Sequence, residues 1–308
     1  MTAAALADVL GGQLIGGAGK GGETIRFLSR LDDPESAGAM TFCSGSDVPN
    51  WTRTLASGAA AVICTREAAA WLVANQCAKF LIAVDAPRLA FAQAARLMMV
   101  ERHRPGAGIA RTATLDPSVQ IAAGVSVGPN AVIGENCSIG AGSWLGPAVV
   151  LGAATAIGPG CRVEAGAVLG GRGYGYVRDL DGILLDFPQL GRVIVGSDVD
   201  IGAHTSIDCG SLQDTVIGDG TKIDDLVYVA HNVTVGRHCL IMAGAILCGG
   251  CSIGDGVEIS PGAIIRENVT VAAGARVGLG AVVTKDVSGN QLVAGVPARP
   301  FRSPRGGK

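Results

Sequence analysis

The chain has few aromatic residues and few charges. Aromatic residues make up 4% and charged residues 16% of its 308 residues, so a core cannot be built mainly from large rings. The net charge of −2 provides no basic field to attract nucleic acid or an anionic membrane. No uninterrupted apolar run is long enough to span a bilayer. We therefore expect no nucleic-acid partner and at most peripheral membrane contact.

The N-terminus has no basic stretch before its apolar residues and contains Asp8. We therefore expect no secretory signal and a cytoplasmic protein. The chain has nine cysteines. Cys248 and Cys251 form a CGGC motif that a metal or redox site would also show. We favour the interpretation that the cysteines are small buried core residues of a protein in a reducing compartment, because four of them fall on one phase of a six-residue repeat. These are Cys137, Cys161, Cys239 and Cys251.

What the chain does have is glycine, 47 residues, and an aliphatic residue at every sixth position over most of its length. The series starts at Ile109 and reaches Leu169, then resumes at Val195. It slips by four residues after Ile207 and runs from Ile217 to Val283. The position four residues after each aliphatic is small or β-branched. A helix has a period of about 3.6 residues and cannot hold this phase.

A triangular coil satisfies the repeat. Each six-residue unit supplies one short strand and one corner, and three units close one turn of about 18 residues. Aliphatic side chains then stack inside, and parallel strands pair about 4.8 Å apart. The left-handed sense follows from resemblance to known hexapeptide-repeat proteins. We predict a mainly β fold, a left-handed parallel β-helix over residues 105–290 with a tail over residues 291–308.

Residues 1–104 lack the period and predict a small α/β domain. The linker is expected at Arg104-Pro105-Gly106, because proline and glycine favour a break. Short buried runs predict strands, and longer mixed runs predict helices. The expected strands are Ala59–Cys64 and Phe80–Val84, and the expected helices are Leu6–Leu10, Glu67–Asn75 and Leu89–Arg102.

One segment interrupts the coil, the inserted loop at residues 170–191. It holds two of the three tyrosines of the chain. In a solenoid, insertions on one face often form the binding face. We therefore expect this loop to bind a ligand.

Histidine is the residue type most suited to proton transfer near neutral pH, and the chain has four. His103 lies in the linker, and the period places His204, His231 and His238 at corners of the coil. Their spacing matches no zinc motif, and no nucleophile elbow, P-loop or dinucleotide fingerprint is present. We therefore expect no metal site. The period by itself does not single out His231.

Several motifs resemble those of UDP-3-O-acylglucosamine N-acyltransferases, enzymes of lipid A biosynthesis. They are GYGYVRD from Gly173, PQLGRV from Pro188, TSID from Thr205, DTVIGDGTKID from Asp214 and AHN from Ala230. The slip before Ile217 is also similar. Residues 8–17 and 37–45 resemble the uridine-binding domain of that family, and residues 293–302 resemble its terminal motif.

The resemblance implies roles for particular residues. His231 would be the general base that takes the proton of the glucosamine 2-amino group. Asp224 would orient His231 or the sugar, and the Gly249 N–H would stabilise the oxyanion. The substrate-binding residues would be Phe42, which stacks on uracil, with Tyr174, Tyr176, Gln189, Asp225 and Asn268.

The resemblance also implies partners. The acyl donor would be a 3-hydroxyacyl group on the phosphopantetheine arm of acyl carrier protein, with no other cofactor. Homotrimers would place each site between subunits. The chain departs from the family pattern at five positions, Gly45, Arg172, Cys209, Asp225 and Asn268.

These departures leave two alternatives open. The first is a diverged acyltransferase that acylates or acetylates another amino sugar or amine, with coenzyme A as the donor. The second is a non-enzymatic scaffold or a metal-dependent hexapeptide protein.

Overall fold

A computed structural model of the chain describes residues 1–16, 24–31, 37–45, 47–98 and 106–300. The chain divides into two compact units, Met1–Arg104 and Pro105–Lys308. His103 and the expected linker residues Arg104 and Pro105 lie outside the described residues. No helix in the described ranges is both long and apolar enough to cross a bilayer.

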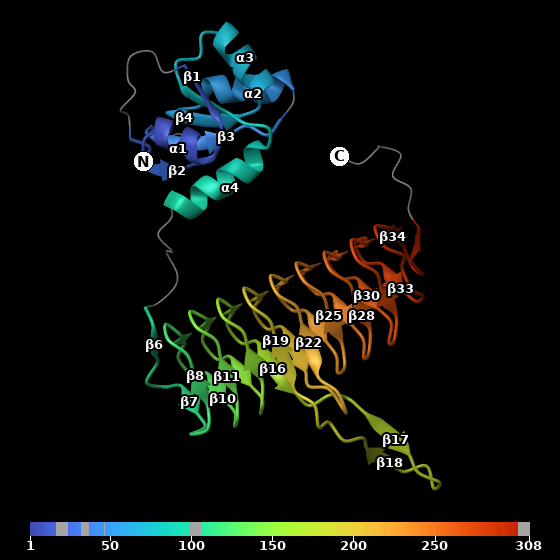
Figure 1. The fold of residues 1–308 in the computed structure, drawn as a ribbon. Helices are drawn as coiled ribbons and strands as arrows, with labels where there is room; N and C mark the ends of the chain where they lie inside the picture. Colours follow the sequence, from blue (N-terminus) through green and yellow to red (C-terminus); the bar gives the residue numbers. More distant parts are fainter. Residues whose placement is uncertain (17–23, 32–36, 46, 99–105, 301–308) are drawn as a thin grey trace. The chain divides into compact units, whose positions relative to one another are not determined.

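The first unit is a five-stranded sheet with helices on both faces (Figure 1). The sheet order is β1-β5-β4-β3-β2, and only β1 is antiparallel to its neighbour. The strands are β1 Gln13–Gly16, β2 Phe27–Leu28, β3 Ala39–Phe42, β4 Ala61–Cys64 and β5 Phe80–Ala83. The helices are α1 Ala3–Val9, α2 Val48–Ala56, α3 Arg66–Ala74 and α4 Pro87–Met98.

Local sequence explains where these helices begin. The side chains of Thr2, Asp47 and Thr65 accept hydrogen bonds from N–H groups in the first turns of α1, α2 and α3. Apolar residues of α1 and α4 pack on one face of the sheet, and those of α2 and α3 pack on the other. Strands β1 to β3 and helix α2 were not expected, because their sequences carry no clear apolar period.

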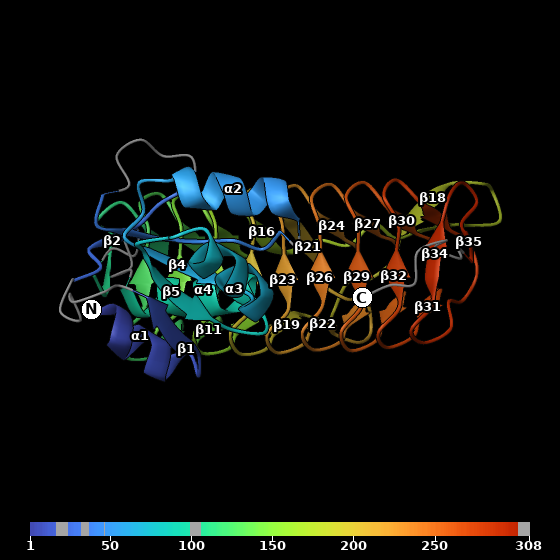
Figure 2. The same ribbon diagram turned by 90° about the horizontal axis from the view of Figure 1, so that it is seen from above.

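The second unit is a parallel coil with three long sheets, and successive strands visit the three sheets in turn (Figures 1 and 2). The first sheet has β7 Thr114–Leu115, β10 Val132–Ile133, β13 Val150–Leu151, β16 Val168–Gly171, β21 Ser206–Asp208, β24 Tyr228–Val229, β27 Ile246–Leu247, β30 Ile264–Ile265 and β33 Val282–Val283. The second has β8 Gln120–Ile121, β11 Ser138–Ile139, β14 Ala156–Ile157, β19 Val193–Val195, β22 Thr215–Ile217, β25 Thr234–Val235, β28 Ser252–Ile253 and β31 Thr270–Val271.

The third sheet has β6 Gly108–Ile109, β9 Ser126–Val127, β12 Trp144–Leu145, β15 Arg162–Val163, β20 Asp200–Ile201, β23 Lys222–Ile223, β26 Leu240–Ile241, β29 Glu258–Ile259, β32 Arg276–Val277, β34 Leu292–Ala294 and β35 Arg299–Pro300. Figure 2 shows β23, β26, β29 and β32 in a row along the coil. The strands of the three sheets from β6 to β34 pair in parallel, as in Val132 with Val150, whereas β17 and β18 belong to the inserted loop.

The repeated aliphatic is the inward residue of each strand. Leu145, Ile201 and Val229 are fully buried, and burying each such side chain contributes about 1.5–3 kcal/mol. Ile109 is 52% exposed, because it belongs to the first turn and has no turn beneath it. The parallel coil predicted from the period is confirmed.

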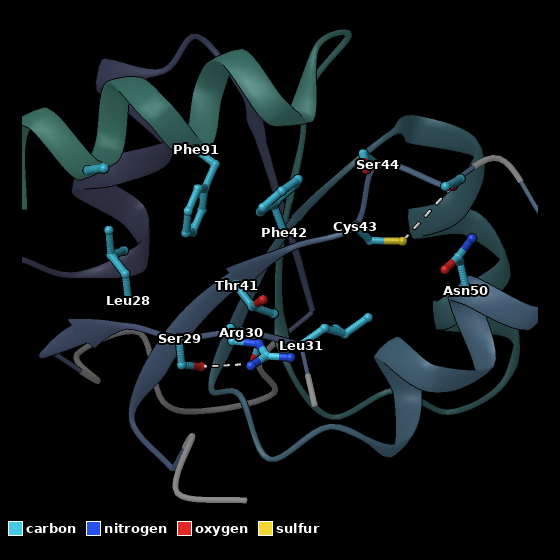
Figure 3. A pocket seen from close by; sticks show the side chains of 12 residues that line it. Leu28, Ser29, Arg30, Leu31, Thr41, Phe42, Cys43, Ser44, Asn50 and Phe91 are labelled. Atoms are coloured by element: carbon cyan, nitrogen blue, oxygen red, sulfur yellow. Dashed lines mark hydrogen bonds between the residues drawn. The ribbon is translucent and has the colours of Figure 1, made fainter. Parts of the chain in front are cut away.

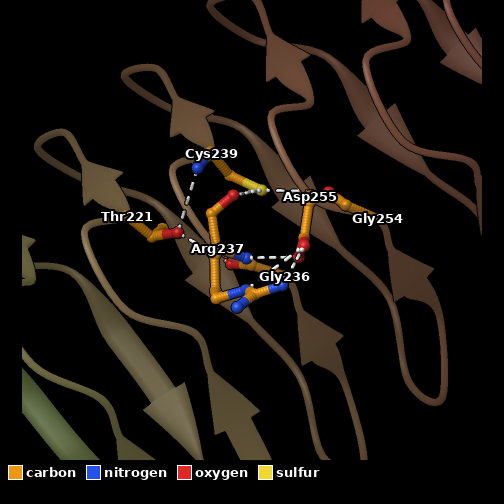
Figure 4. A network of polar contacts seen from close by, with 6 residues as sticks. All are labelled: Thr221, Gly236, Arg237, Cys239, Gly254 and Asp255. Carbon is orange, nitrogen blue, oxygen red and sulfur yellow. Dashed lines mark hydrogen bonds and ion pairs between the residues drawn. The ribbon is translucent and has the colours of Figure 1, made fainter.

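Side chains of the small repeat position tie successive corners together (Figure 4). Thr221 Oγ1 donates to Gly236 O at 2.8 Å and accepts from the Cys239 N–H at 3.0 Å. Cys239 Sγ in turn donates to Gly254 O at 3.1 Å. Hydroxyl and thiol groups are therefore interchangeable at this position, since either one satisfies a buried carbonyl.

The CGGC cysteines are part of the same structure. Cys251 is buried, and burial raises the pKa of its thiol to about 12. Burial also raises the pKa of the Cys248 thiol. Because the reactive form of cysteine is the thiolate, Cys251 fits the core role expected from the repeat, whereas Cys248 is only partly buried and lies outside that repeat position.

Two segments depart from the repeat, the inserted loop and the four-residue slip. The inserted loop forms a hairpin of β17 Tyr176–Arg178 and β18 Leu184–Asp186 that extends away from the coil (Figure 1). The four-residue slip lies between Asp208 and Thr215, and neighbouring strands there are 22 residues apart, as in Val195 with Ile217.

Candidate active site

A groove on the coil contains His231. It has a volume of about 620 Å³, and its walls come from the slip, the corner after β24 and the two turns above it. The lining residues are Ser211, Leu212, Gln213, His231, Asn232, Gly249, Gly250, Glu267 and Asn268. The structure thus brings together three residues predicted from the sequence, His231, Gly249 and Asn268.

Asn232 fixes the proton on the His231 ring. Asn232 Oδ1 lies 2.8 Å from His231 Nδ1 and also accepts from the Ser211 N–H and hydroxyl, at 3.2 and 2.7 Å. A backbone N–H can only donate, so the atom that Asn232 turns toward Ser211 and His231 is its carbonyl oxygen. His231 Nδ1 therefore carries the proton in the neutral ring, and Nε2 presents a lone pair. A ring in this state can accept a proton from a substrate.

The slip in the repeat supports this arrangement. Asn232 Nδ2 donates to Gln213 O at 3.3 Å, and the Asn232 N–H donates to Thr215 Oγ1 at 2.9 Å. Asn232 has a φ of 63°, a left-handed conformation that asparagine tolerates better than most residues. The extra residues of the slip therefore hold the side chain that orients His231.

Gly249 lies against the His231 ring, one turn further along the coil. A Cβ at Gly249 would lie 2.8 Å from His231 Cε1 and 3.0 Å from Nε2. At the same corner position of another turn, the Arg237 N–H donates to Asp255 Oδ1 at 2.8 Å. The Gly249 N–H has no such acceptor within the described part of the chain, because the residue one turn above, Glu267, turns its carboxylate to Arg266. An open N–H beside the base is suited to bind an oxyanion.

The inserted hairpin starts beside His231. A Cβ at Gly173 would lie 2.7 Å from His231 Cβ and would overlap Gln189 Oε1. Gln189 Nε2 donates to Phe187 O at 3.1 Å, whereas the buried Oε1 atom has no partner among the described residues. Gln189 can therefore offer an acceptor to a substrate near the base.

The two predicted tyrosines lie on this hairpin. Tyr174 and Tyr176 have ring centroids 5.2 Å apart, and Tyr174 is 78% exposed. Arg172, at a position where the resembling family has aspartate, pairs with Asp186 across the hairpin and lies 5.9 Å from the Tyr176 ring centroid. Both rings are thus available to a ligand that follows the hairpin.

Asp224 and Asp225 do not join His231. They lie at the preceding corner, between β23 and β24. Asp224 accepts from the N–H groups of Asp225 and Ala243, and Asp225 Oδ1 accepts from the Ala203 N–H at 2.6 Å. Asp224 therefore does not orient His231, because backbone groups take its carboxylate and Asn232 makes that contact instead. A contact of Asp224 with the sugar, the other role that the resemblance implies, stays a prediction.

Phe42 lines a separate cavity in the first unit, with a volume of about 620 Å³ (Figure 3). Phe42 of β3 and Phe91 of α4 have ring centroids 4.7 Å apart. The polar lining includes Arg30 and Asn50. Gly45, where the resembling family has asparagine, leaves room for Asn50, whose side chain a Cβ at Gly45 would overlap.

Comparisons with known proteins identify the class of protein to which the coil is similar. Residues 136–171 and 214–249 match the bacterial transferase hexapeptide model, which describes six repeats. The coil also superposes on two solved structures. These are the UDP-N-acetylglucosamine O-acyltransferase of Moraxella catarrhalis, with a TM-score of 0.59 and 24% identity, and the UDP-N-acetylglucosamine acyltransferase of Francisella novicida, with a TM-score of 0.57 and 25% identity. Each alignment covers 63% of this chain and 73% or 70% of the other. The predicted left-handed parallel β-helix is confirmed.

The particular similarity is to UDP-3-O-acylglucosamine N-acyltransferases. The protein of this name from Methylorubrum extorquens (strain PA1) is 38% identical over 141 residues, which is 46% of this chain and 40% of that protein. The protein from Coxiella burnetii (strain Dugway 5J108-111) is 52% identical over 87 residues, 28% of this chain and 25% of that protein. The matches thus span less than half the length of these relatives. They confirm the resemblance predicted from the sequence.

Sequence reasoning missed Asn232 and Ser211 as functional candidates. Asn232 is the third residue of the AHN motif, and Ser211 lies within the slip, so both stood in segments that the pattern marked. What the pattern could not give is their contact, because 21 residues separate them in the chain.

Proposed function

We propose that the chain is an N-acyltransferase that moves a 3-hydroxyacyl group from a thioester to the 2-amino group of UDP-3-O-acylglucosamine. The observation that carries this proposal is the pairing of His231 with the open Gly249 N–H in one groove. A base next to an oxyanion donor is the arrangement that acyl transfer to an amine requires. The similarity to named N-acyltransferases supports the choice of acceptor.

The proposed reaction uses the two groups that the groove brings together, the His231 ring and the Gly249 N–H. The amine nitrogen attacks the thioester carbonyl carbon, and His231 Nε2 takes the N–H proton as the C–N bond forms. The carbonyl oxygen becomes an oxyanion and accepts a hydrogen bond from the Gly249 N–H. When the C–S bond breaks, the proton moves from His231 to the departing sulfur. The products are an amide and a free thiol, and His231 is neutral again.

The test is transfer from a 3-hydroxyacyl carrier protein to UDP-3-O-acylglucosamine, followed by mass spectrometry. A product heavier by one acyl group supports the proposal. Coenzyme A thioesters tested beside the carrier protein distinguish the donors, and acylation of another amino sugar only from coenzyme A would favour the diverged enzyme instead. No product with any donor and acceptor would contradict the proposal.

The first unit would bind the nucleotide. Its cavity offers the Phe42 ring to a flat base, and Asn50 and Arg30 add polar groups at the rim. Stacking on an aromatic ring is worth about 1–3 kcal/mol per base. We therefore expect Phe42→Ala to raise the KM for the UDP substrate roughly 5- to 100-fold with little change in kcat. Steady-state kinetics measure this, and Phe27→Ala, at an exposed ring outside the cavity, is the control. An unchanged KM would contradict the role of Phe42.

A homotrimer would complete the site. Most outward residues of the sheet that leads to His231 are apolar, among them Val132, Val150, Ile246, Ile264 and Val282, whereas Thr114 and Ser206 are polar. The sheet of β25 and β28 instead presents polar residues such as Thr234 and Ser252. A row of apolar residues on a surface indicates an interface. In the proposed homotrimer, this face would pack against another copy of the chain.

Ile264→Arg should therefore dissociate the assembly. A charge buried in an apolar interface is strongly unfavourable, so light scattering should give the mass of one chain, about 31 kDa. Ser252→Arg, on the polar sheet, is the matched control and should leave the mass unchanged. A trimeric Ile264→Arg protein would show that this face does not form the interface.

A further inference from the structure

A buried carboxylate lies next to the proposed base and has no part in the mechanism above. Asp208, at the end of β21, is 6% exposed, and it is the one charged residue that is buried among those described. An isolated buried charge is unfavourable by several kcal/mol unless it is paired or hydrogen-bonded. The groups around Asp208 must therefore compensate the cost of burying its charge.

The strand register places Asp208 beside the His231 corner. Ile207 pairs with Val229, so Asp208 is next to Ala230, the residue before His231. On its other side, Asp208 is paired with Gly171 at the start of the inserted loop, where a bulge breaks the register. A Cβ at Gly171 would lie 3.3 Å from Asp208 Oδ1. The carboxylate is thus enclosed between the loop and the strand that leads to the base.

A hydrogen bond from Tyr228 holds the carboxylate. Tyr228 Oη donates to Asp208 Oδ2 at 2.7 Å. Burial, and then the contact with Asp208, raises the pKa of Tyr228, so the phenol keeps its proton and remains a donor. Burial raises the pKa of the Asp208 carboxyl, while the Tyr228 hydrogen bond and the positive form of His231 oppose that change. The strand register, which places Asp208 beside the residue before His231, puts the two groups on neighbouring turns of the coil.

We infer that Asp208 is a positioning residue for the proposed acyl transfer, a fixed negative group that stabilises the positive ring formed when His231 takes the amine proton. The inference rests on the proposed role of His231. Three groups near the His231 ring have different roles. Asn232 Oδ1 holds Nδ1, the Gly249 N–H faces the oxyanion, and Asp208 supplies the counter-charge from the strand below. Glu267, the carboxylate among the residues that line the groove, is paired with Arg266, whereas Asp208 lies behind the groove and is held by the neutral Tyr228 hydroxyl.

The experiment compares Asp208→Asn with the wild type. Asparagine keeps the shape and an acceptor for Tyr228 but removes the charge. We therefore expect kcat to fall roughly 10- to 100-fold, the scale of the effect that a nearby opposite charge has on a protonation equilibrium. The KM should change less than about threefold. Asp200→Asn is the matched control, because Asp200 is half-exposed on another sheet and pairs with Lys222. It should keep the wild-type kcat.

A second readout does not depend on turnover. Diethylpyrocarbonate modifies neutral imidazole, and peptide mass mapping follows His231 and the exposed His204 in one sample. In Asp208→Asn, the pH at which His231 becomes half-reactive should move to lower pH, because the charge that favoured the positive ring is gone. His204 should not move.

The outcomes separate the two proposals. If the wild type forms no acylated product but the His231 profile still moves in Asp208→Asn, the charge coupling stands and the proposed substrate is wrong. If the wild type is active and Asp208→Asn retains both kcat and the His231 profile, with unchanged thermal stability, the role of Asp208 is overturned. Tyr228→Phe, which leaves the carboxylate in place, should give a smaller loss than Asp208→Asn, and a larger loss would assign the effect to packing instead.

Discussion

Replacing His231 with glutamine should lower kcat for acyl transfer at least several hundredfold, within the roughly 10²–10⁴-fold range of a positioned general base. The amine must lose a proton as the amide forms, and no other side chain lining the groove combines a lone pair with the ability to carry that proton near neutral pH. Glutamine can still reach Asn232, so the substitution removes the base while keeping the polar contact. Rates from mass spectrometry of the acylated sugar measure the effect.

His238→Gln is the matched control, because His238 is an exposed corner residue of the same coil. It should retain the wild-type rate. Thermal unfolding of both variants should agree with the wild type, since neither ring is part of the core. A His231→Gln enzyme with more than a tenth of the wild-type kcat would contradict the assignment of the base, and Glu267 would then be the next candidate on the same groove.

Adding one methyl group at Gly249 should have the second largest effect, roughly a 100-fold loss of kcat. The new Cβ would lie 2.8 Å from His231 Cε1, closer than two carbon atoms can approach. The ring must move, while Asn232 holds it at Nδ1. The displaced Nε2 no longer meets the amine in line with the acyl carbon, and a misplacement of about 1 Å has this scale of effect on rate.

The backbone at this corner accepts a Cβ, because alanine occupies the same position in other turns, as Ala153 and Ala243 do. Gly249→Ala should therefore unfold at the wild-type temperature, and the loss should fall on kcat. Ala153→Gly, the reverse change far along the coil, is the control and should leave the rate unchanged. A Gly249→Ala enzyme with the wild-type kcat would show that the ring has room to move, and that this turn does not constrain the base.

Much of the fold could be predicted from the sequence. The six-residue period reports which side chain of each short strand points inward, and from Ile133 to Val283 the predicted aliphatics are buried. The first unit was less predictable, because strands such as β2, with only Phe27 and Leu28, are too short to show a period. The inserted loop could be placed, but its hairpin could not.

The candidate site could also be predicted only in part. The motifs marked His231 and Gly249, and their separation of one turn follows from the period. They also suggested Asp224, which the structure assigns to a corner hydrogen bond with Ala243. The contacts of Asn232 with Ser211, and of Tyr228 with Asp208, join residues 20 or more positions apart.

The sequence by itself determined the coil and its inward residues, because a regular period reports which side chain of each strand points inward. His231 was identified by the resemblance of its AHN motif to a known family, since the period does not distinguish it from the other corner histidines. Only the tertiary structure decided which groups surround His231. The slip and the inserted loop change the spacing between turns, so the neighbours of His231 depend on how the corners pack. Packing brings Asn232 to the ring and Ser211 to Asn232, whereas the resemblance had suggested Asp224 for this contact.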